Sequence, residues 1–499
     1  MGLPERELWK EAMGMDADTI LRMKPALTEY LHVFDGCFGR ITARRHLDTY
    51  VEGQLSDLPR KSVEPIADAA GTPPRDLQEF LGLYRWEELT MRDRLQQRVA
   101  RRHAHPHSVG ILDETGYVKK GTKTACVQRQ YCGAAGKTEN CVISVHLGYA
   151  TPDFHTLLDA DLYLPEETWH ADRQRCRAAG IPDTVVYRPK WQIGLEQIRR
   201  ARANGVHFAW MTFDEAYGGK PPFLRALDEM GQFYVGEVPV NFRVWSKPPA
   251  VLCREQVTSR PGRPRRFPRL KVRNNPPVEV RHVASYSPVF RREAWQTYHV
   301  KDGHKGPMVW RGKRLPVWLR DEHGLPTAPH HLLVAQSVLQ PETIKYFISN
   351  APEDTSVETL LLVAFSRWKI ERMFEDGKGK LGMDHFEVRK FRSIQRHLIL
   401  SCVSYLFLAE FHQAHRGEKS GPDGGPGADG DGAAGADLVS WGPVFAQVSR
   451  DDQPADPSHP APQCQGGTQP PQANAASIAR HRPVSEEPTH LSVEPFVAL

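Results

Sequence analysis

The sequence predicts an α/β protein, and the order of its segments is the main reason. Between residues 106 and 238, short apolar runs alternate with segments of helical spacing, as in a sheet that is covered by helices. Residues 239–330 are rich in proline and arginine and hold short strand-like runs, and the α/β pattern resumes over 331–415. We therefore expect a mixed sheet that is interrupted by a β-rich insertion.

Residues 1–105 are predicted to be helical. Apolar residues recur there at helical spacing, and Gly71, Pro73 and Pro74 break two of the helices. Arginine is frequent in this segment. This composition fits a solvated helical bundle and a DNA-contacting one equally well.

The insertion is expected to be built of strands and to carry a basic face. Strand-like runs are EVRHVASY, TYHVKD and PMVWRG. Residues 254–273 contain many arginines together with lysine, but a single acidic residue, Glu255. Such a cluster favours contact with phosphates.

The C-terminal segment, residues 416–499, is predicted to be disordered. Glycine, proline, alanine, aspartate, glutamine and serine dominate it. Segments of this composition bury too little apolar surface to offset the entropy of ordering.

Composition also indicates where the protein resides. The eight cysteines form no CxxC pair, and the first twenty residues lack the apolar core of a signal peptide. The apolar run 392–411 carries Arg392, Arg396 and His397 in its first half, so we expect a buried core helix rather than a membrane span. A cytoplasmic protein without a membrane partner is expected.

Two aspartates end strand-like runs. Asp113 closes SVGILD, and Asp214 closes HFAWMTFD. An apolar strand that ends in aspartate is common and by itself indicates nothing more than structure. Two such ends in one α/β layer favour a site for hard cations, because Mg²⁺ and Mn²⁺ prefer carboxylate oxygens.

A third acid lies on a predicted helix. Arg367, Glu371 and Lys378 follow one another at i, i+4 and i+11, so their side chains share one helical face. A surface helix with an Arg–Glu pair would have the same pattern. Glu375 lies one turn beyond Glu371 and is the rival third acid.

These residues resemble the R-x3-E-x6-K signature of cut-and-paste DDE transposases from bacterial insertion sequences. The resemblance includes LDETGYVKKG, the LYLPE run, FDEAYG and RWKIE, and it spans about residues 30–410. It implies an RNase H-like catalytic domain with a β-rich insertion before the last acid. The longer interval between Asp214 and Glu371 than between Asp113 and Asp214 agrees with such an insertion.

The resemblance also implies a function. Asp113, Asp214 and Glu371 would be the catalytic acids and would hold two Mg²⁺ or Mn²⁺ ions. The chain would cut double-stranded DNA at the terminal inverted repeats of an element and join the freed 3′-OH to target DNA. It would work in the cytoplasm, at the nucleoid, as a homodimer on DNA, with the N-terminal helices reading the ends. The expected phosphate contacts are Arg367, Lys378, Arg263, Arg265, Arg266 and Arg269.

One position departs from the family's pattern. The wider signature begins with tyrosine three residues before the arginine, whereas this chain has Ala364 followed by Phe365. A tyrosine contact to a DNA phosphate is therefore missing or replaced. A hairpin-forming step that depends on this contact is in doubt.

Overall fold

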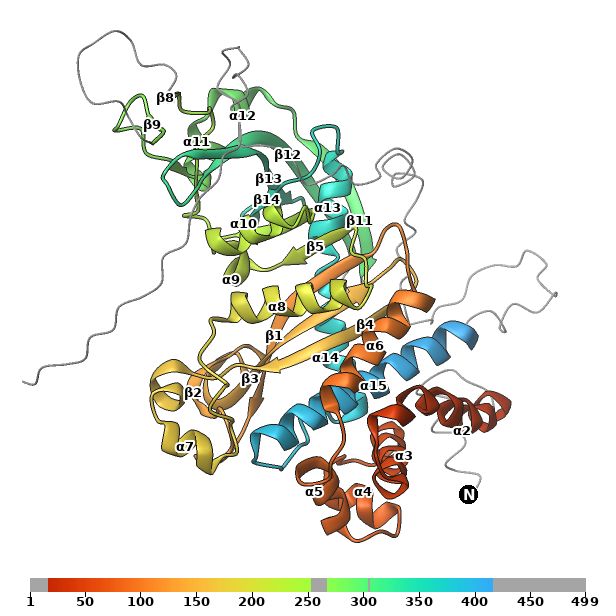
Figure 1. The fold of residues 1–499 in the computed structure, drawn as a ribbon. Helices are drawn as coiled ribbons and strands as arrows, with labels where there is room; N and C mark the ends of the chain where they lie inside the picture. Colours follow the sequence, from red (N-terminus) through yellow and green to blue (C-terminus); the bar gives the residue numbers. More distant parts are fainter. Residues whose placement is uncertain (1–16, 253–266, 304–305, 416–499) are drawn as a thin grey trace, which may run out of the picture.

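The computed structural model describes residues 17–252, 267–303 and 306–415 (Figure 1). In these ranges ten strands form one sheet, in the order β11-β12-β13-β14-β6-β5-β1-β3-β2, with β4 added on β3. The strands are β1 (Val109–Val118), β2 (Gln128–Cys132), β3 (Lys137–Ala150), β4 (His155–Leu162), β5 (Trp210–Phe213), β6 (Tyr234–Val238), β11 (Gln296–Gly303), β12 (Gly306–Arg320), β13 (Pro326–Ser337) and β14 (Ile344–Ser349).

The middle of the sheet is parallel and its two arms are antiparallel. β1, β5 and β6 run in the same direction. β3 continues the sheet on one side and β14 on the other, both antiparallel to their neighbours. With helices packed against it, this mixed sheet confirms the α/β, RNase H-like fold class.

Helices lie on both sides of β1 and β3 (Figure 1). On one side, α8 (Lys190–Ala203) packs so closely that a Cβ added to Gly194 would overlap the side chain of Leu112. On the other side, α14 (Trp368–Leu381) lies against β3, where a Cβ added to Gly148 would be 3.1 Å from Met373 Sδ. Since successive side chains of a strand point to opposite faces, Asp113 belongs to the α14 face.

Further helices lie between these strands or, in the case of α13, after the last of them. They are α7 (Arg173–Ala178), α9 (Glu215–Gly218), α10 (Pro221–Glu229) and α13 (Val357–Phe365). A π-helical turn, η3 (Glu166–His170), precedes α7, and a 3-10 turn, η2 (Gly133–Ala135), joins β2 to β3. The hydroxyl of Ser356 caps α13 by accepting from Thr359 N at 3.0 Å, as expected of serine at this position.

The insertion is partly helical. It contains β7 (Arg243–Val244), β8 (Val251–Leu252), β9 (Arg269–Leu270), β10 (Val278–Glu279), α11 (Val280–Tyr286) and α12 (Pro288–Arg292). The strands expected at TYHVKD and PMVWRG are confirmed as parts of β11 and β12. The prediction of a strand at EVRHVASY is wrong, because most of this run forms the helix α11, in which Val280 and Val283 are buried at helical spacing. Residue 330, where we expected the insertion to end, lies inside β13.

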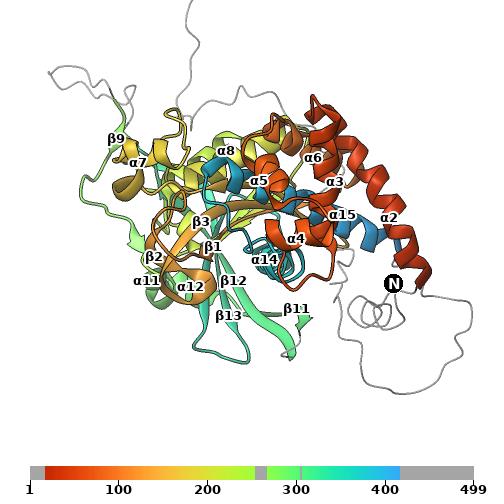
Figure 2. The same cartoon turned by 90° about the horizontal axis from the view of Figure 1, so that it is seen from below.

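The N-terminal region is helical, as predicted. It contains α2 (Ala17–Leu31), a 3-10 turn η1 (His32–Cys37), α3 (Ile41–Leu55), α4 (Val63–Ala69), α5 (Pro74–Gly82) and α6 (Glu88–Arg102). The predicted breakers act where expected, because Gly71 has φ +64° after α4 and Pro74 is the first residue of α5. Figure 2 shows this region beside α15 (Phe391–His415).

The helix α15 is the buried core helix that was expected. Most of its side chains are buried, and it contacts α2, α3, α5, α6 and β4. No helix within the described ranges is both long enough and apolar enough to span a bilayer. The predicted disordered tail lies outside the described residues.

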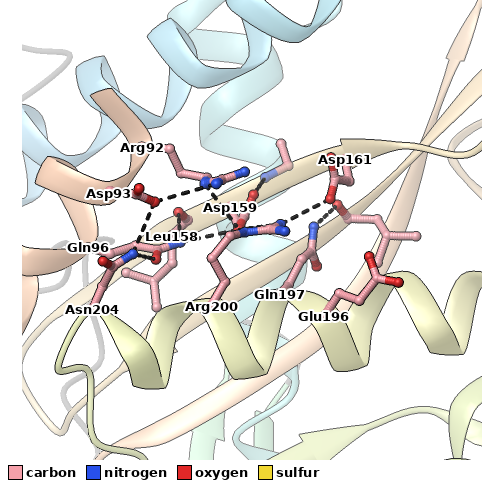
Figure 3. A network of polar contacts seen from close by, with 12 residues as sticks. Arg92, Asp93, Gln96, Leu158, Asp159, Asp161, Glu196, Gln197, Arg200 and Asn204 are labelled. Atoms are coloured by element: carbon pink, nitrogen blue, oxygen red, sulfur yellow. Dashed lines mark hydrogen bonds and ion pairs between the residues drawn. The ribbon is translucent and has the colours of Figure 1, made fainter. Parts of the chain in front are cut away.

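A buried ionic network ties the N-terminal helices to the sheet (Figure 3). Asp159 on β4 is fully buried and accepts from Arg200 Nη2 on α8 at 2.8 Å and from Gln96 Nε2 on α6 at 3.2 Å. Arg200 Nη2 also donates to Asp161 Oδ2 at 3.0 Å. Because removing one partner of a buried pair leaves an uncompensated charge, this network holds α6, β4 and α8 in one arrangement.

Arg396 connects α15 with the N-terminal helices by a second set of buried contacts. Its side chain on α15 is fully buried and donates to the backbone oxygens of Phe80 (3.0 Å), Tyr84 (2.9 Å) and Trp86 (2.9 Å) and to Glu88 Oε2 (3.1 Å). Its guanidinium also lies over the Trp86 ring, 4.2 Å from the centroid.

We expect Arg396→Gln to lower the free energy of unfolding by about 3–5 kcal/mol, because it leaves the buried backbone oxygens of Phe80, Tyr84 and Trp86 without this donor. Arg392 is a matched control, since it also pairs with Glu88 but its side chain is 47% exposed. Arg392→Gln should cost about 1 kcal/mol or less. Urea unfolding of the full chain, followed by circular dichroism, measures both. Equal losses for the two variants would contradict the structural role of Arg396.

Candidate active site

Strand register brings the two predicted aspartates together. In the parallel pair β1–β5, Leu112 is the partner of Phe213. The next residues, Asp113 and Asp214, therefore stand at the same level on neighbouring segments of the sheet. Neighbouring strands lie about 4.8 Å apart. The two carboxylates therefore share one end of the parallel part of the sheet.

Each aspartate is fixed by its own backbone surroundings. Asp113 Oδ1 accepts from Glu114 N at 2.7 Å. Asp214 caps α9, and its Oδ1 accepts from Ala216 N at 3.0 Å. Asp214 is thus held directly after the end of β5, as predicted. The prediction that a strand ends at Asp113 is wrong, because β1 continues to Val118 in its pairing with β3 and Asp113 lies within it.

Arg367 joins Asp113 to the predicted third acid. Its Nη1 donates to Asp113 Oδ2 at 2.8 Å, and its Nη2 donates to Glu371 Oε1 at 2.9 Å. Arg367 immediately precedes α14, and Glu371 lies in the first turn of that helix. One guanidinium therefore connects β1 with α14 on the face to which Asp113 belongs.

The rival acid has another partner. Glu375 Oε2 accepts from Arg372 Nη1 at 3.1 Å, and its side chain is 72% exposed. Glu371 is the acid of this pair that is connected to Asp113. Its role as a ligand stays a prediction.

Lys378 points into the protein. Its Nζ donates to Thr115 Oγ1 at 2.7 Å and to the backbone oxygen of Gly116 at 3.1 Å. It also lies 5.4 Å from the centroid of the Tyr117 ring. Burial lowers the pKa of this lysine. A phosphate contact by Lys378 would have to replace these contacts with β1.

The acids crowd one another electrostatically. Burial and the neighbouring charge of Asp214 raise the pKa of Asp113 to about 7, although Arg367 opposes the rise. Burial also raises the pKa of Asp214, again against the effect of Arg367. One guanidinium thus compensates the carboxylates only in part, and more positive charge would stabilise their ionised forms.

The donor set is chemically suited to a hard divalent cation, because all of the predicted ligands are carboxylates. In the described ranges, however, no three histidine, cysteine, aspartate or glutamate side chains are close enough together to hold an ion. Arg367 accounts for this arrangement, since its guanidinium lies between Asp113 and Glu371.

Three neighbours of the aspartates were not anticipated. Glu114 pairs with Lys190, Tyr217 is buried on α9, and Glu237 on β6 accepts from Lys345 Nζ at 2.7 Å. Burial raises the pKa of Tyr217 far above its usual value, and the charges of Glu114, Asp113 and Asp214 raise it further. Glu237 follows the pattern of Asp113 and Asp214, because it directly follows the last residue of β6 that pairs with β5.

The other expected DNA contacts are only partly described. Arg269 is half-buried on β9, opposite Leu252 of β8. Arg263, Arg265 and Arg266 lie outside the described residues. None of these roles is tested.

The position of the missing tyrosine is a core position. Ala364 is 4% exposed. Phe365 packs against Trp310 and Phe347, with ring centroids 4.6 and 5.9 Å away. Neither residue offers a polar group to DNA.

The raised pKa of Asp113 predicts how stability depends on pH. The folded protein retains this proton between the ordinary pKa of 3.8 and about 7, whereas the unfolded chain releases it. The free energy of unfolding therefore falls as pH rises through this window, by at most about 4 kcal/mol. In EDTA, Asp113→Asn should melt several degrees above the wild type at pH 8, and the difference should shrink toward pH 4.

The exposed Asp153 supplies the control for this experiment. Asp153→Asn should change the melting temperature little at either pH, because surface charges contribute little to stability. If the difference in melting temperature between Asp113→Asn and the wild type stays constant between pH 4 and pH 8, the raised pKa of Asp113 is not its cause.

The chain is similar to known DNA-processing proteins. A family model described as DDE superfamily endonuclease matches residues 33–307, a range that includes Asp113 and Asp214 but ends before Arg367 and Glu371. The probable transposase for insertion sequence element IS701 of Microchaete diplosiphon is 30% identical over 195 residues. The match covers 38% of this chain and 48% of that protein, so the chain spans about half the length of this curated relative. Since the family model covers more than half of the 499 residues, the chain belongs to the DDE superfamily of endonucleases.

Proposed function

We infer that this protein is a DNA transposase that cleaves the ends of an insertion sequence and joins the 3′-OH to target DNA. The observation that carries this inference is the meeting of Asp113 and Asp214 in strand register, with Glu371 connected to Asp113 through Arg367. The similarity to an insertion-sequence transposase supports it.

Asp113, Asp214 and Glu371 are the residues that would hold two Mg²⁺ or Mn²⁺ ions. Two such ions, about 4 Å apart, supply activation of an attacking oxygen and stabilisation of a leaving oxygen in an in-line displacement. These residues suit divalent cations because all three are carboxylates and because Arg367 neutralises only part of their negative charge.

The chain's own residues position the reaction. The sheet holds Asp113 within β1 and Asp214 directly after β5. Lys378 donates to the hydroxyl of Thr115 and to the backbone oxygen of Gly116 on β1. Arg367, when it is not paired with the acids, can bind a phosphate of the DNA by its planar fork of donors. The described cation Arg269 and its neighbours in the insertion would add phosphate contacts whose strength depends on salt.

This function implies the DNA substrates, the way the repeats are recognised, the oligomeric state and the cellular setting. The substrates would be the double-stranded terminal inverted repeats and a target duplex. Recognition of the repeats would fall to the helices of residues 17–102, which could reach base edges in a major groove. Pairing of two ends favours a homodimer on DNA, and the setting would be the cytoplasmic nucleoid.

A nuclease that cuts but does not join is the alternative, because hydrolysis needs the same acids. A derivative that binds DNA without cutting is disfavoured by the presence of all three carboxylates. Only the joined product separates a transposase from a nuclease.

We expect the full chain, with Mg²⁺, to convert a duplex that carries the inverted repeats flanking its gene into a product covalently joined to a supercoiled target plasmid. Sequencing of the junctions, and the transfer of a label from the cut 3′ end, would detect the joining. A control duplex with scrambled ends should give no joined product. Cleavage of the repeats without any joined product would support the nuclease and refute transposition.

We expect Asp113→Asn, Asp214→Asn and Glu371→Gln each to lower the cleavage rate by at least about 10³-fold, as is usual when one member of a catalytic unit is removed. Glu375→Gln is the matched control on the same helix and should change the rate by no more than a few-fold. Single-turnover cleavage of labelled DNA measures all four. Normal cleavage by Glu371→Gln together with an inactive Glu375→Gln would reverse the assignment of the third acid.

A further inference from the structure

Glu237 continues the row of acids that Asp113 and Asp214 begin. In the parallel pair β5–β6, Phe213 is the partner of Gly236, so Glu237 stands at the level of Asp214 just as Asp214 stands at the level of Asp113. The row thus crosses three adjacent parallel strands. Side chains at one level of a parallel sheet point to the same face.

The position of Glu237 is fixed by close packing. A Cβ added to Gly218 on α9 would overlap the backbone oxygen of Glu237, so the helix that Asp214 caps rests directly on this residue. The side chain of Glu237 is 18% exposed, and Lys345 on β14 donates to it at 2.7 Å. Glu237 is therefore a largely buried carboxylate with a cation on the side away from Asp214.

Arg367 is within electrostatic reach of the whole row. Burial lowers the pKa of Arg367, but Asp113, Glu371, Asp214 and Glu237 together raise it above its ordinary value. Two of these acids, Asp113 and Glu371, hold the guanidinium by hydrogen bonds. The other two are near it without a hydrogen bond to it in the described structure.

Loading of divalent ions would disturb this arrangement. The oxygens that Arg367 occupies, Asp113 Oδ2 and Glu371 Oε1, belong to the carboxylates that would ligate the ions. Like charges that compete for one carboxylate repel each other, and the repulsion is strong where water is scarce. The side chain of Arg367 is only 23% exposed, so a guanidinium that leaves these acids needs another anionic partner.

We propose that Glu237 is a positioning residue that receives Arg367 when divalent ions take Asp113 and Glu371. In the ion-free protein, Arg367 acts as an internal cation that closes the site. With ions bound, the guanidinium turns toward Glu237, at the edge of the site, where it can also meet a DNA phosphate. The inference rests on the metal site of the proposed function.

A double-variant cycle of Mn²⁺ binding tests this proposal without DNA. Electron paramagnetic resonance of free Mn²⁺ gives the affinity of the full-length protein and its variants. Glu237→Gln should weaken Mn²⁺ binding about tenfold, because Arg367 then has no alternative acid and stays on Asp113 and Glu371. Arg367→Gln should strengthen binding, because it removes the competing cation.

The decisive variant combines the two changes. In the Arg367→Gln background, Glu237→Gln should alter the Mn²⁺ affinity by less than about twofold, since the residue acts through the arginine. If the tenfold weakening persists in this background, Glu237 acts on the ions by its own charge, and the proposal is overturned. An unchanged affinity of the single Glu237→Gln variant overturns it as well.

Two control variants separate this role from a structural one. Lys345→Gln breaks the same ion pair but frees Glu237 for Arg367, so it should not weaken Mn²⁺ binding; equal weakening by Lys345→Gln and Glu237→Gln would indicate only a structural pair and overturn the proposal. Glu342→Gln removes an exposed acid near β14 and should have no effect. If Glu237→Gln fails to fold, Glu237→Asp, which keeps the charge on a shorter side chain, should weaken binding about threefold in the wild-type background and not in Arg367→Gln.

The outcomes also distinguish this proposal from the function on which it rests. If the wild type binds no Mn²⁺, or if Asp113→Asn binds it as tightly as the wild type, the metal site itself is absent and the proposed function fails. If Asp113→Asn abolishes binding while the cycle shows no coupling, only the role of Glu237 fails.

Discussion

The parallel register of β1, β5 and β6 is the constraint on which the site depends. It places Asp113, Asp214 and Glu237 at one level of the sheet, and burial raises the pKa of both Asp113 and Asp214. Folding would gain by keeping such carboxylates apart, because each pair of like charges costs free energy in a poorly hydrated place. The arrangement is tolerated because Arg367, which immediately precedes α14, supplies a cation to Asp113, and the proposed function assigns the concentrated negative charge to divalent ions.

The frame around this row is rigid for reasons unrelated to its charge. Asp159 and Arg200 link α6, β4 and α8 through buried ionic contacts, and Arg396 anchors α15 to the N-terminal helices. Such contacts contribute little net stability compared with apolar packing, but breaking one of them is costly. They therefore fix how the helices of residues 17–102 sit against the catalytic sheet.

Much of this arrangement could be predicted from the sequence, but register could not. Apolar runs that end in acids indicated a strand end at Asp214, which is confirmed, and one at Asp113, which is wrong because β1 pairs with β3 as far as Val118. The i, i+4 spacing indicated the pairing of Arg367 with Glu371. Glu237 had the same local pattern but was missed, because nothing in one sequence tells which strand lies beside which. The short run EVRHVASY suited a strand by composition, whereas the packing of Val280 and Val283 selects a helix. Local patterns thus indicated elements, and the contacts between distant elements decided their roles.

Lys378 and Arg367 share one face of α14 but have different contacts. Lys378 lies on the same face of α14 as Arg367 and Glu371, yet its ammonium is bound to Thr115 and to the backbone of Gly116. Gly116 itself cannot carry a side chain without moving Cys132, because an added Cβ would lie 2.5 Å from Cys132 Sγ. The lysine therefore reaches the backbone of β1 three residues beyond Asp113 at a point where β1 and β2 are closely packed. Arg367 at the start of the helix pairs with Asp113 and Glu371, while Lys378 near its end binds Thr115 and Gly116, so one helical face contacts β1 at two separate places.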